Sequence, residues 1–138
     1  MLASHRYVIH GDPIPLARSR FAHGRVFDPQ KLKKQLWMDE LAYQHLTRPF
    51  FSGPLHLDIV FYMPIPKLSK KIMERIDGAA HYKRPDLDNM LKFVCDTCNG
   101  VLVKDDAAFA IINSRKVYSH QPRTEFIITE LKDEVNLK

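Results

Sequence analysis

An alternating segment in the middle of the chain constrains the fold more than any other feature. Apolar side chains occupy every second position, at Leu55, Leu57, Ile59 and Phe61, and the positions between them hold His56, Asp58, Val60 and Tyr62. Successive side chains of a β-strand point to opposite faces of a sheet, so this pattern predicts a strand with one buried face. The following Met63-Pro64-Ile65-Pro66 ends the strand, because proline cannot donate to the ladder of backbone hydrogen bonds.

The segment after Pro85 has the other periodicity and predicts a helix. Its apolar residues recur three and four positions apart and define one buried face, made of Leu87, Met90, Leu91, Val94, Cys95 and Cys98. Asn99-Gly100 supplies the stop. Asp88, Lys92 and Asp96 are each four apart and therefore line up along a different, polar face. Asp86 precedes the helix, where a carboxylate normally caps the free N–H groups.

Further strands and helices are expected around these two elements. The pattern predicts a first strand at Tyr7–Ile9, a loop or hairpin at Leu16–Phe27 and a short basic helix at Ser69–Ile76. Asp28-Pro29 predicts another helix start with Asp28 as the N-cap, and this helix would run to about Thr47. Its apolar face is imperfect and consists of Leu32, Leu36, Leu41, Tyr43 and Leu46, broadened by Trp37 and Met38.

Two strands are expected near the end of the sequence. They cover residues 107–118 and 124–131, and Ser119-His120-Gln121-Pro122 would join them as a hairpin. The order strand, helix, strand, short helix, helix, strand, strand implies an α+β fold, in which helices pack on a small mixed β-sheet. A chain of 138 residues suffices for one sizeable core, so residues 1–138 are expected to form a single domain.

The distribution of charge favours an anionic partner. The net charge is +5, and the basic residues concentrate in two stretches: Arg18, Arg20, Arg25, Lys31, Lys33 and Lys34, then Lys67, Lys70, Lys71, Arg75, Lys83 and Arg84. Nucleic acid is favoured over a membrane surface, because neither stretch forms a strongly apolar amphipathic helix. No apolar run approaches the roughly 20 residues of a membrane span, and the first residues do not resemble a secretory signal. A cytoplasmic location is therefore expected.

Cys95 and Cys98 form a Cys-x-x-Cys pattern that allows several interpretations. Zinc would need two further ligands, and the chain has no second pair with ligand spacing. A redox-active dithiol is an alternative. Both cysteines also lie on the apolar face of the predicted helix, which favours buried structural thiols.

The acids around the same helix allow two readings. Asp86 could serve as an N-cap, Asp88 as a first-turn acid, and Asp88 with Lys92 as an ordinary ion pair. Asp105 and Asp106 add two carboxylates at a turn where the chain could fold back, however, and like charges repel unless a cation or proton intervenes. Magnesium prefers such oxygen ligands and could activate water and polarise a phosphoryl oxygen. A calcium-binding EF-hand loop is excluded, because Asp86-x-Asp88 lacks the loop glycine and the terminal glutamate.

The run Lys83-Arg84-Pro85-Asp86-Leu87-Asp88-Asn89-Met90-Leu91-Lys92, followed by Asp96, Asn99-Gly100 and Asp105-Asp106, resembles the RusA-type Holliday junction resolvase family. Phe61-Tyr62-Met63-Pro64-Ile65-Pro66 and the segment from Pro13 to Arg20 are similar to phage-type members, which suggests a phage or prophage origin. The likeness spans roughly Tyr7 to Glu130. The chain departs from the family around Asp96, where members more often carry small residues or leucine in place of the cysteines.

The resemblance implies a homodimeric, RusA-like endonuclease that cuts two opposing strands of a four-way DNA junction with Mg²⁺ or Mn²⁺. Carried over by position, Asp86, Asp88 and Asp106 would be the catalytic metal ligands and Lys92 the catalytic lysine. Asp105 is a supporting candidate, and Asp96 would have a structural role. The candidate DNA-binding residues are Arg18, Arg20, Lys70, Lys71, Lys83, Arg84, Arg115 and Lys116. Two alternatives remain open: a nuclease of the same fold that acts on other branched DNA, and a protein that binds branched DNA without cutting it.

Overall fold

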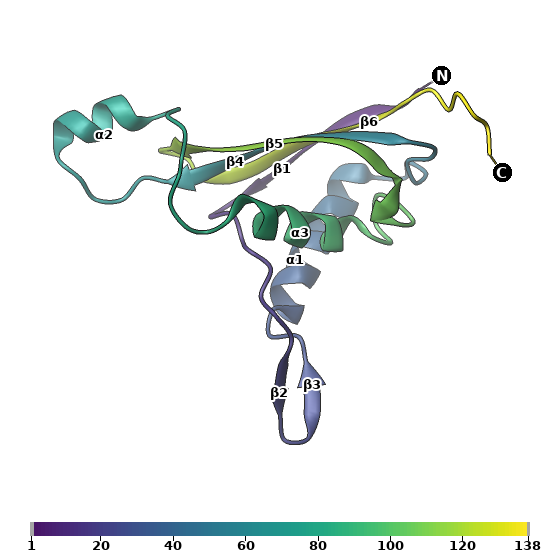
Figure 1. The fold of residues 1–138 in the computed structure, drawn as a ribbon, viewed down its shortest axis with the longest axis horizontal. Coiled ribbons are helices and arrows are strands. Elements are labelled where there is room, and N and C mark those ends of the chain that lie inside the picture. Colours follow the sequence, from purple (N-terminus) through teal and green to yellow (C-terminus); the bar gives the residue numbers. More distant parts are fainter. Residues whose placement is uncertain (1, 138) are drawn as a thin grey trace.

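A four-stranded mixed sheet with helices on one face forms the body of the molecule (Figure 1). The computed structural model describes residues 2–137. The strands are β1 (Ser4–His10), β6 (Arg123–Glu130), β4 (Leu55–Pro64) and β5 (Phe109–Ser119), in that spatial order. Strand β4 runs antiparallel to β6 and parallel to β5. The helices α1 (Lys31–His45) and α3 (Leu87–Cys98) both lie on the same side of the sheet. The predicted α+β fold with a small mixed sheet is therefore confirmed.

The alternating segment is the central strand, as its burial requires. Leu55, Leu57, Ile59 and Phe61 are each 0% exposed and belong to the hydrophobic core, together with Met90, Phe93, Val94 and Cys98 of α3. Burying one large apolar side chain stabilises the fold by about 1.5–3 kcal/mol. The buried faces of β4 and α3 thus belong to one core cluster.

The predicted hairpin between the last two strands is wrong. β5 and β6 do not pair with each other, because β4 lies between them and takes one on each edge. The short turn at residues 120–122 therefore passes over the end of β4. A strand with a continuous buried face gains most in the middle of a sheet, where both edges are paired, and this non-local preference overrides the local turn signal.

Helix α1 begins later than predicted. It starts at Lys31 with Gln30 at the N-cap position, whereas Asp28 lies outside the helix. The Asp28 carboxylate accepts hydrogen bonds from the Gln30 N–H at 2.8 Å and from the Lys34 ammonium at 2.6 Å. The buried Gln30 side chain accepts from the Ala17 N–H and donates to the Pro15 carbonyl, which fixes the entry to the helix. Tertiary partners therefore shift the start that the Asp-Pro pair predicts.

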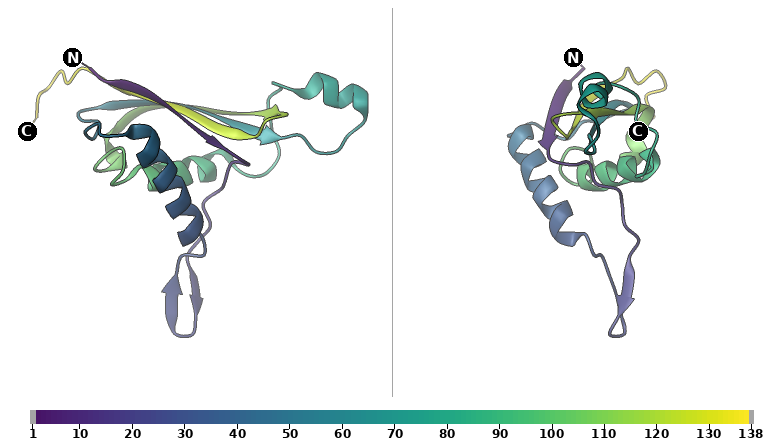
Figure 2. Two further views of the ribbon diagram at one scale, coloured as in Figure 1. Left: turned by 180° about the vertical axis from the view of Figure 1, so that it is seen from behind. Right: turned by 90° about the vertical axis from the view of Figure 1, so that its left-hand side faces the viewer.

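The predicted apolar face of α1 is only partly right, because Leu41 and Trp37 are buried while Leu32, Leu36, Tyr43 and Leu46 are exposed. Its buried residues are Trp37, Leu41 and His45. An exposed stripe, which we call the α1 stripe, runs along the helix and consists of Leu32, Leu36, Tyr43 and Leu46. The first half of α1 extends beyond the sheet, as Figures 1 and 2 show, so its outer apolar residues stay largely exposed. At the other end the His45 ring enters the core, because Tyr7 and the Pro49 carbonyl satisfy its two nitrogens.

Two segments project from the body in different directions (Figure 2). One is the hairpin of β2 (Arg20–Ala22) and β3 (Arg25–Phe27), which confirms the hairpin reading of this region. The other carries α2 (Lys70–Ile76), whose N-cap Ser69 accepts from the Ile72 N–H. The chain returns from α2 along the outer edge of β5, where Ala80 bridges Val117. Both projections carry basic residues of the two stretches.

The outer edge of β1 is covered at Val8 by a side chain of α1. Gln44 Oε1 accepts from the Val8 N–H at 3.0 Å, and Gln44 Nε2 donates to the Val8 carbonyl at 2.6 Å. One amide thus pairs with both backbone groups that Val8 turns outward. Of the helices formed by residues 2–137, none is long and apolar enough to cross a membrane.

Candidate active site

Helix α3 places the predicted polar residues along its exposed side. Its buried face is confirmed and also includes Phe93 and Thr97, which the spacing argument missed. On the opposite side the Lys92 ammonium lies 3.8 Å from Asp88 Oδ2. Both side chains are open to solvent, at 61% and 70% exposed, so this pair contributes little to stability. It is available for other interactions.

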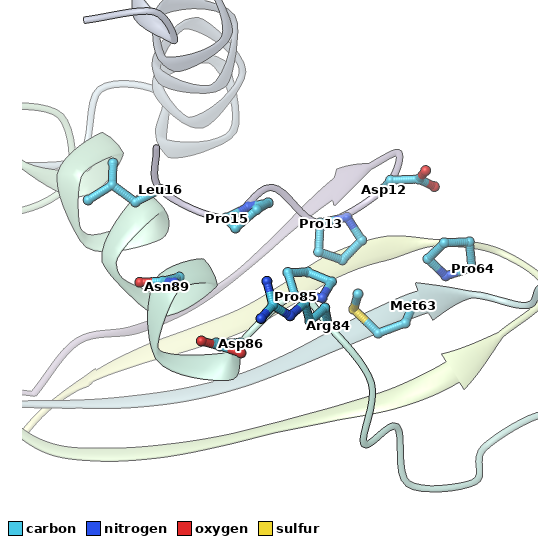
Figure 3. A pocket seen from close by; sticks show the side chains of 10 residues that line it. All are labelled: Asp12, Pro13, Pro15, Leu16, Met63, Pro64, Arg84, Pro85, Asp86 and Asn89. Atoms are coloured by element: carbon cyan, nitrogen blue, oxygen red, sulfur yellow. The ribbon is translucent and has the colours of Figure 1, made fainter. Parts of the chain in front are cut away.

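Asp86 occupies the N-cap position of α3 without acting as a cap. Its backbone is extended, as an N-cap requires, but its carboxylate accepts no capping hydrogen bond. The side chain lies at the rim of an open cleft of about 600 Å³ (Figure 3). Four prolines line this cleft together with Asp12, Leu16, Met63, Arg84 and Asn89. The contacts of Asp86 therefore do not support the interpretation that it is a helix cap.

Asp105 and Asp106 have different roles at the other end of the helix. Asp105 caps a short 3-10 helix, η1 (Asp106–Ala108), and accepts from the Ala107 N–H at 2.9 Å. The backbone N–H of Asp106 donates to Asn99 Oδ1 at 2.7 Å. Partial burial raises the pKa of the Asp106 carboxyl, and the charges of Asp105 and Asp96 raise it further. Negative charge is therefore crowded at Asp106, and a bound cation would relieve it.

Asp96 faces a lysine of α1. Its carboxylate lies 3.5 Å from the ammonium of Lys34, which also binds Asp28 at 2.6 Å. Lys34 thus links Asp28 at the entry to α1 with Asp96 in the last turn of α3. These interactions hold the two helices together beside the polar edge of α3.

The candidate ligands are distributed in two groups along α3. Asp86 and Asp88 lie at its start with Lys92, whereas Asp106 lies beside Asp96 near its end. The helix rises by about 1.5 Å per residue, so the backbones of Asp88 and Asp96 are separated by about 12 Å along the axis. Between residues 2 and 137, no three histidine, cysteine or acidic side chains lie close enough together to hold a metal ion. The donor chemistry suits Mg²⁺, but the structure does not gather the three predicted ligands, and their joint role stays a prediction.

The two cysteines lie against the core and are free thiols. Burial raises the pKa of Cys95 to about 11, and the nearby Asp106 and Asp96 charges contribute. Burial raises the pKa of Cys98 as well. Thiolates are the reactive and metal-binding form, so both positions favour the interpretation as structural thiols.

Most of the candidate DNA-binding residues are exposed and spread over several elements. Arg18 lies just before the hairpin and Arg20 lies on it. Lys70 and Lys71 belong to α2, Lys83 and Arg84 precede α3, and Arg115 lies on β5. Lys116 differs from them, because it is half-buried and its ammonium donates to the carbonyls of Lys83 and Pro85. No pattern in the sequence indicates this contact. Asp12 and Asn89, which line the cleft beside Asp86, were also not predicted and carry no motif of their own.

The sequence matches the model of a known family over most of its length. The family is described as endodeoxyribonuclease RusA, and the match covers residues 10–129. The chain belongs to this family of endodeoxyribonucleases, which confirms the resemblance. The chain is also similar to the uncharacterized protein YqaN of Bacillus subtilis strain 168, with 33% identity over 137 residues, 91% of this chain and 96% of that protein.

Proposed function

We propose that the protein is a divalent-metal-dependent endonuclease that resolves Holliday junctions by paired cuts in opposing strands, in DNA recombination and repair. The observation that carries this proposal is the start of α3, where two carboxylates without capping partners, Asp86 and Asp88, lie with Lys92 on the solvent side. Family membership supplies the class of reaction, which is hydrolysis of DNA.

The acids would bind the metal ion and the lysine would act on the phosphate. Asp86 and Asp88 offer oxygen ligands to Mg²⁺, or to Mn²⁺ as a substitute, and Asp106 is proposed as a further ligand from membership of the family alone. When bound, the ion would supply activated water and polarise a phosphoryl oxygen. The Lys92 ammonium would stabilise negative charge that develops on the phosphate.

The exposed basic residues would hold the branched DNA. Contacts from lysine and arginine to phosphates position a duplex without reading its sequence. The hairpin and α2 project from the body at separate places, so their basic residues could reach different parts of one junction (Figure 1). This arrangement supports recognition of DNA shape.

A homodimer would bring two such sites to the junction. A four-way junction has approximate two-fold symmetry, and a symmetric dimer presents two equivalent sites to it. The α1 stripe supports this proposal, because its four residues are between 60% and 73% exposed and three of them lie on α1, with Leu46 at its C-cap. Apolar surface of this kind is typical of an interaction site.

The direct test compares three DNA substrates. A synthetic four-way junction, a flap and a linear duplex are incubated with the wild type, Asp88→Asn and the control Asp133→Asn, with and without Mg²⁺. Asp133 is an exposed acid far along the sequence from α3, and asparagine keeps the side-chain oxygen that accepts from Val135 and Asn136. We expect paired cuts in the junction by the wild type and the control, and loss of cutting but not of binding in Asp88→Asn.

Two results would change the conclusion. Equal cutting of the flap would leave a nuclease for branched DNA in general. Binding of the junction without any cutting, with Mg²⁺ or Mn²⁺, would contradict the proposed activity and favour a protein that only binds branched DNA.

A further inference from the structure

The chain between α2 and Asp86 is attached to β5 in two different ways. Its first part is held by the backbone: the Gly78 N–H donates to the Tyr118 carbonyl, the Tyr118 N–H to the Ala79 carbonyl, and the His81 N–H to the Lys116 carbonyl. These hydrogen bonds measure 2.8–3.0 Å. Backbone pairing then stops at His81. Residues 82–85 separate it from Asp86, the N-cap of α3.

The second part, residues 82–85, depends on one side chain. The Lys116 ammonium donates to the carbonyl of Lys83 and, at 2.7 Å, to the carbonyl of Pro85. Within residues 2–137 no other hydrogen bond reaches residues 82–85. The lysine is half-buried on β5 and makes no ion pair with a carboxylate in this part of the chain.

These two carbonyls stand one and three residues before Asp86. Hydrogen bonds from a charged donor are stronger than those between neutral groups, and two of them from one ammonium fix the spacing of their acceptors. The carboxylate of Asp86 has no capping bond of its own, so its place at the cleft depends on the backbone that leads to it. A contact that fixes the backbone of residues 83–85 therefore also helps to fix the position of Asp86.

We propose that Lys116 is a positioning residue that fixes the segment before α3 and thereby orients the Asp86 carboxylate. The statement about orientation rests on the proposed function, in which Asp86 binds the metal ion. It replaces the expectation that Lys116 contacts a DNA phosphate, because the ammonium would have to leave both carbonyls to do so.

The experiment compares Lys116→Met with the wild type, with Lys116→Arg as the conservative variant and Lys132→Met as the control. Lys132 is an exposed lysine just past β6 and forms no ion pair in the described chain. If Lys116→Met does not fold, Lys116→Gln serves in its place, because it keeps a polar side chain but removes the ammonium and is one atom shorter. Four quantities are measured: amide hydrogen exchange of residues 82–90, Mn²⁺ binding to the protein alone, junction binding in EDTA, and single-turnover cleavage.

We expect faster exchange at residues 82–90, weaker Mn²⁺ binding and slower cleavage in Lys116→Met, with junction binding in EDTA within twofold of the wild type. Loss of a group that orients a metal ligand lowers metal affinity by about 10–100-fold, and we expect the lower end of this range. Lys116→Arg should restore part of each effect, and Lys132→Met should show none.

The proposal is overturned if Lys116→Met weakens junction binding in EDTA while exchange and Mn²⁺ binding stay unchanged, since the lysine is then a phosphate contact. It is also overturned if none of the four quantities changes. A wild type that cuts no branched DNA contradicts the proposed function instead, and the exchange comparison still decides whether Lys116 holds residues 82–85.

Discussion

The Tyr7 hydroxyl and the Nδ1 atom of His45 lie 2.6 Å apart inside the core and join strand β1 to helix α1. Both residues are almost fully buried. Since the Pro49 carbonyl takes the other ring nitrogen, His45 can replace an apolar residue at the end of α1. This contact helps to set which side of α1 faces the sheet.

Removal of the Tyr7 hydroxyl should therefore destabilise the fold. Tyr7→Phe leaves the buried His45 nitrogen without a partner, which costs about 1–3 kcal/mol in the free energy of unfolding. Urea unfolding followed by circular dichroism measures the difference. Tyr82→Phe is the matched control, because Tyr82 is 82% exposed, lies outside the α1 stripe and should unfold like the wild type. Equal stability of the two variants would contradict the role given to this contact.

Lys92 should matter for cleavage and little for folding. Lys92→Met removes the cation that would stabilise charge on the phosphate, and we expect the cleavage rate to fall by about 100-fold or more. The free energy of unfolding should stay within about 0.5 kcal/mol, because the pair with Asp88 is exposed. Single-turnover cleavage and urea unfolding are the two measurements. Lys132→Met again serves as the control, and a rate unchanged in Lys92→Met would remove this lysine from the proposed mechanism.

Stability should depend on pH through Asp106. The pKa of its carboxyl is raised in the folded state from the ordinary value of 3.8, first by burial and then by Asp105 and Asp96. The folded state thus binds the proton more tightly, so this group lowers stability as the pH rises above 3.8 through the folded pKa. Asp106→Asn carries no such charge and should be more stable than the wild type at pH 7. Urea unfolding at pH 7 and at pH 3.5 should show that the advantage is lost in acid; an equal advantage at both values would contradict this origin.

The α1 stripe should carry the dimer contact. Leu36→Glu places a charge on a residue that is 60% exposed, so it should leave the fold intact and shift a dimer to the monomer. Sedimentation or light scattering at several concentrations measures this change. Val135→Glu alters an apolar residue in the C-terminal segment that is 69% exposed and should have no effect on assembly. A wild type that is monomeric at all concentrations would contradict the proposed homodimer.

The cysteines should be unreactive in the folded protein. Because the pKa of Cys95 is about 11 and that of Cys98 is also raised, few thiolates exist at pH 8. Alkylation by iodoacetamide, followed by mass spectrometry, should be slow in buffer and rapid in denaturant. Rapid alkylation of the native protein would contradict this prediction and favour a redox-active pair of cysteines.

Local periodicity predicted the elements whose burial is decided by apolar contacts. The β4 alternation and the apolar face of α3 both follow directly from side-chain spacing, and together they form the centre of the core. The face of α1 could not be predicted in this way. Its orientation depends on polar partners of His45 and Gln44 that belong to β1 and to the following loop.

The same distinction applies to the candidate site. Spacing along one helix was sufficient to place Asp88, Lys92 and Asp96 on a common edge. The hydrogen bonds of Lys116 join residues about thirty positions apart, and no local pattern predicts them. The separation of Asp106 from Asp86 also depends on where the chain turns back after α3.

The amide of Gln44 imitates one peptide unit of a neighbouring strand. Exposed strand edges are the places where sheets of different molecules join and grow into aggregates. By occupying both outward groups of Val8, Gln44 blocks strand pairing at this point of the edge. A second sheet that approached β1 from outside would thus lack its backbone partners at Val8.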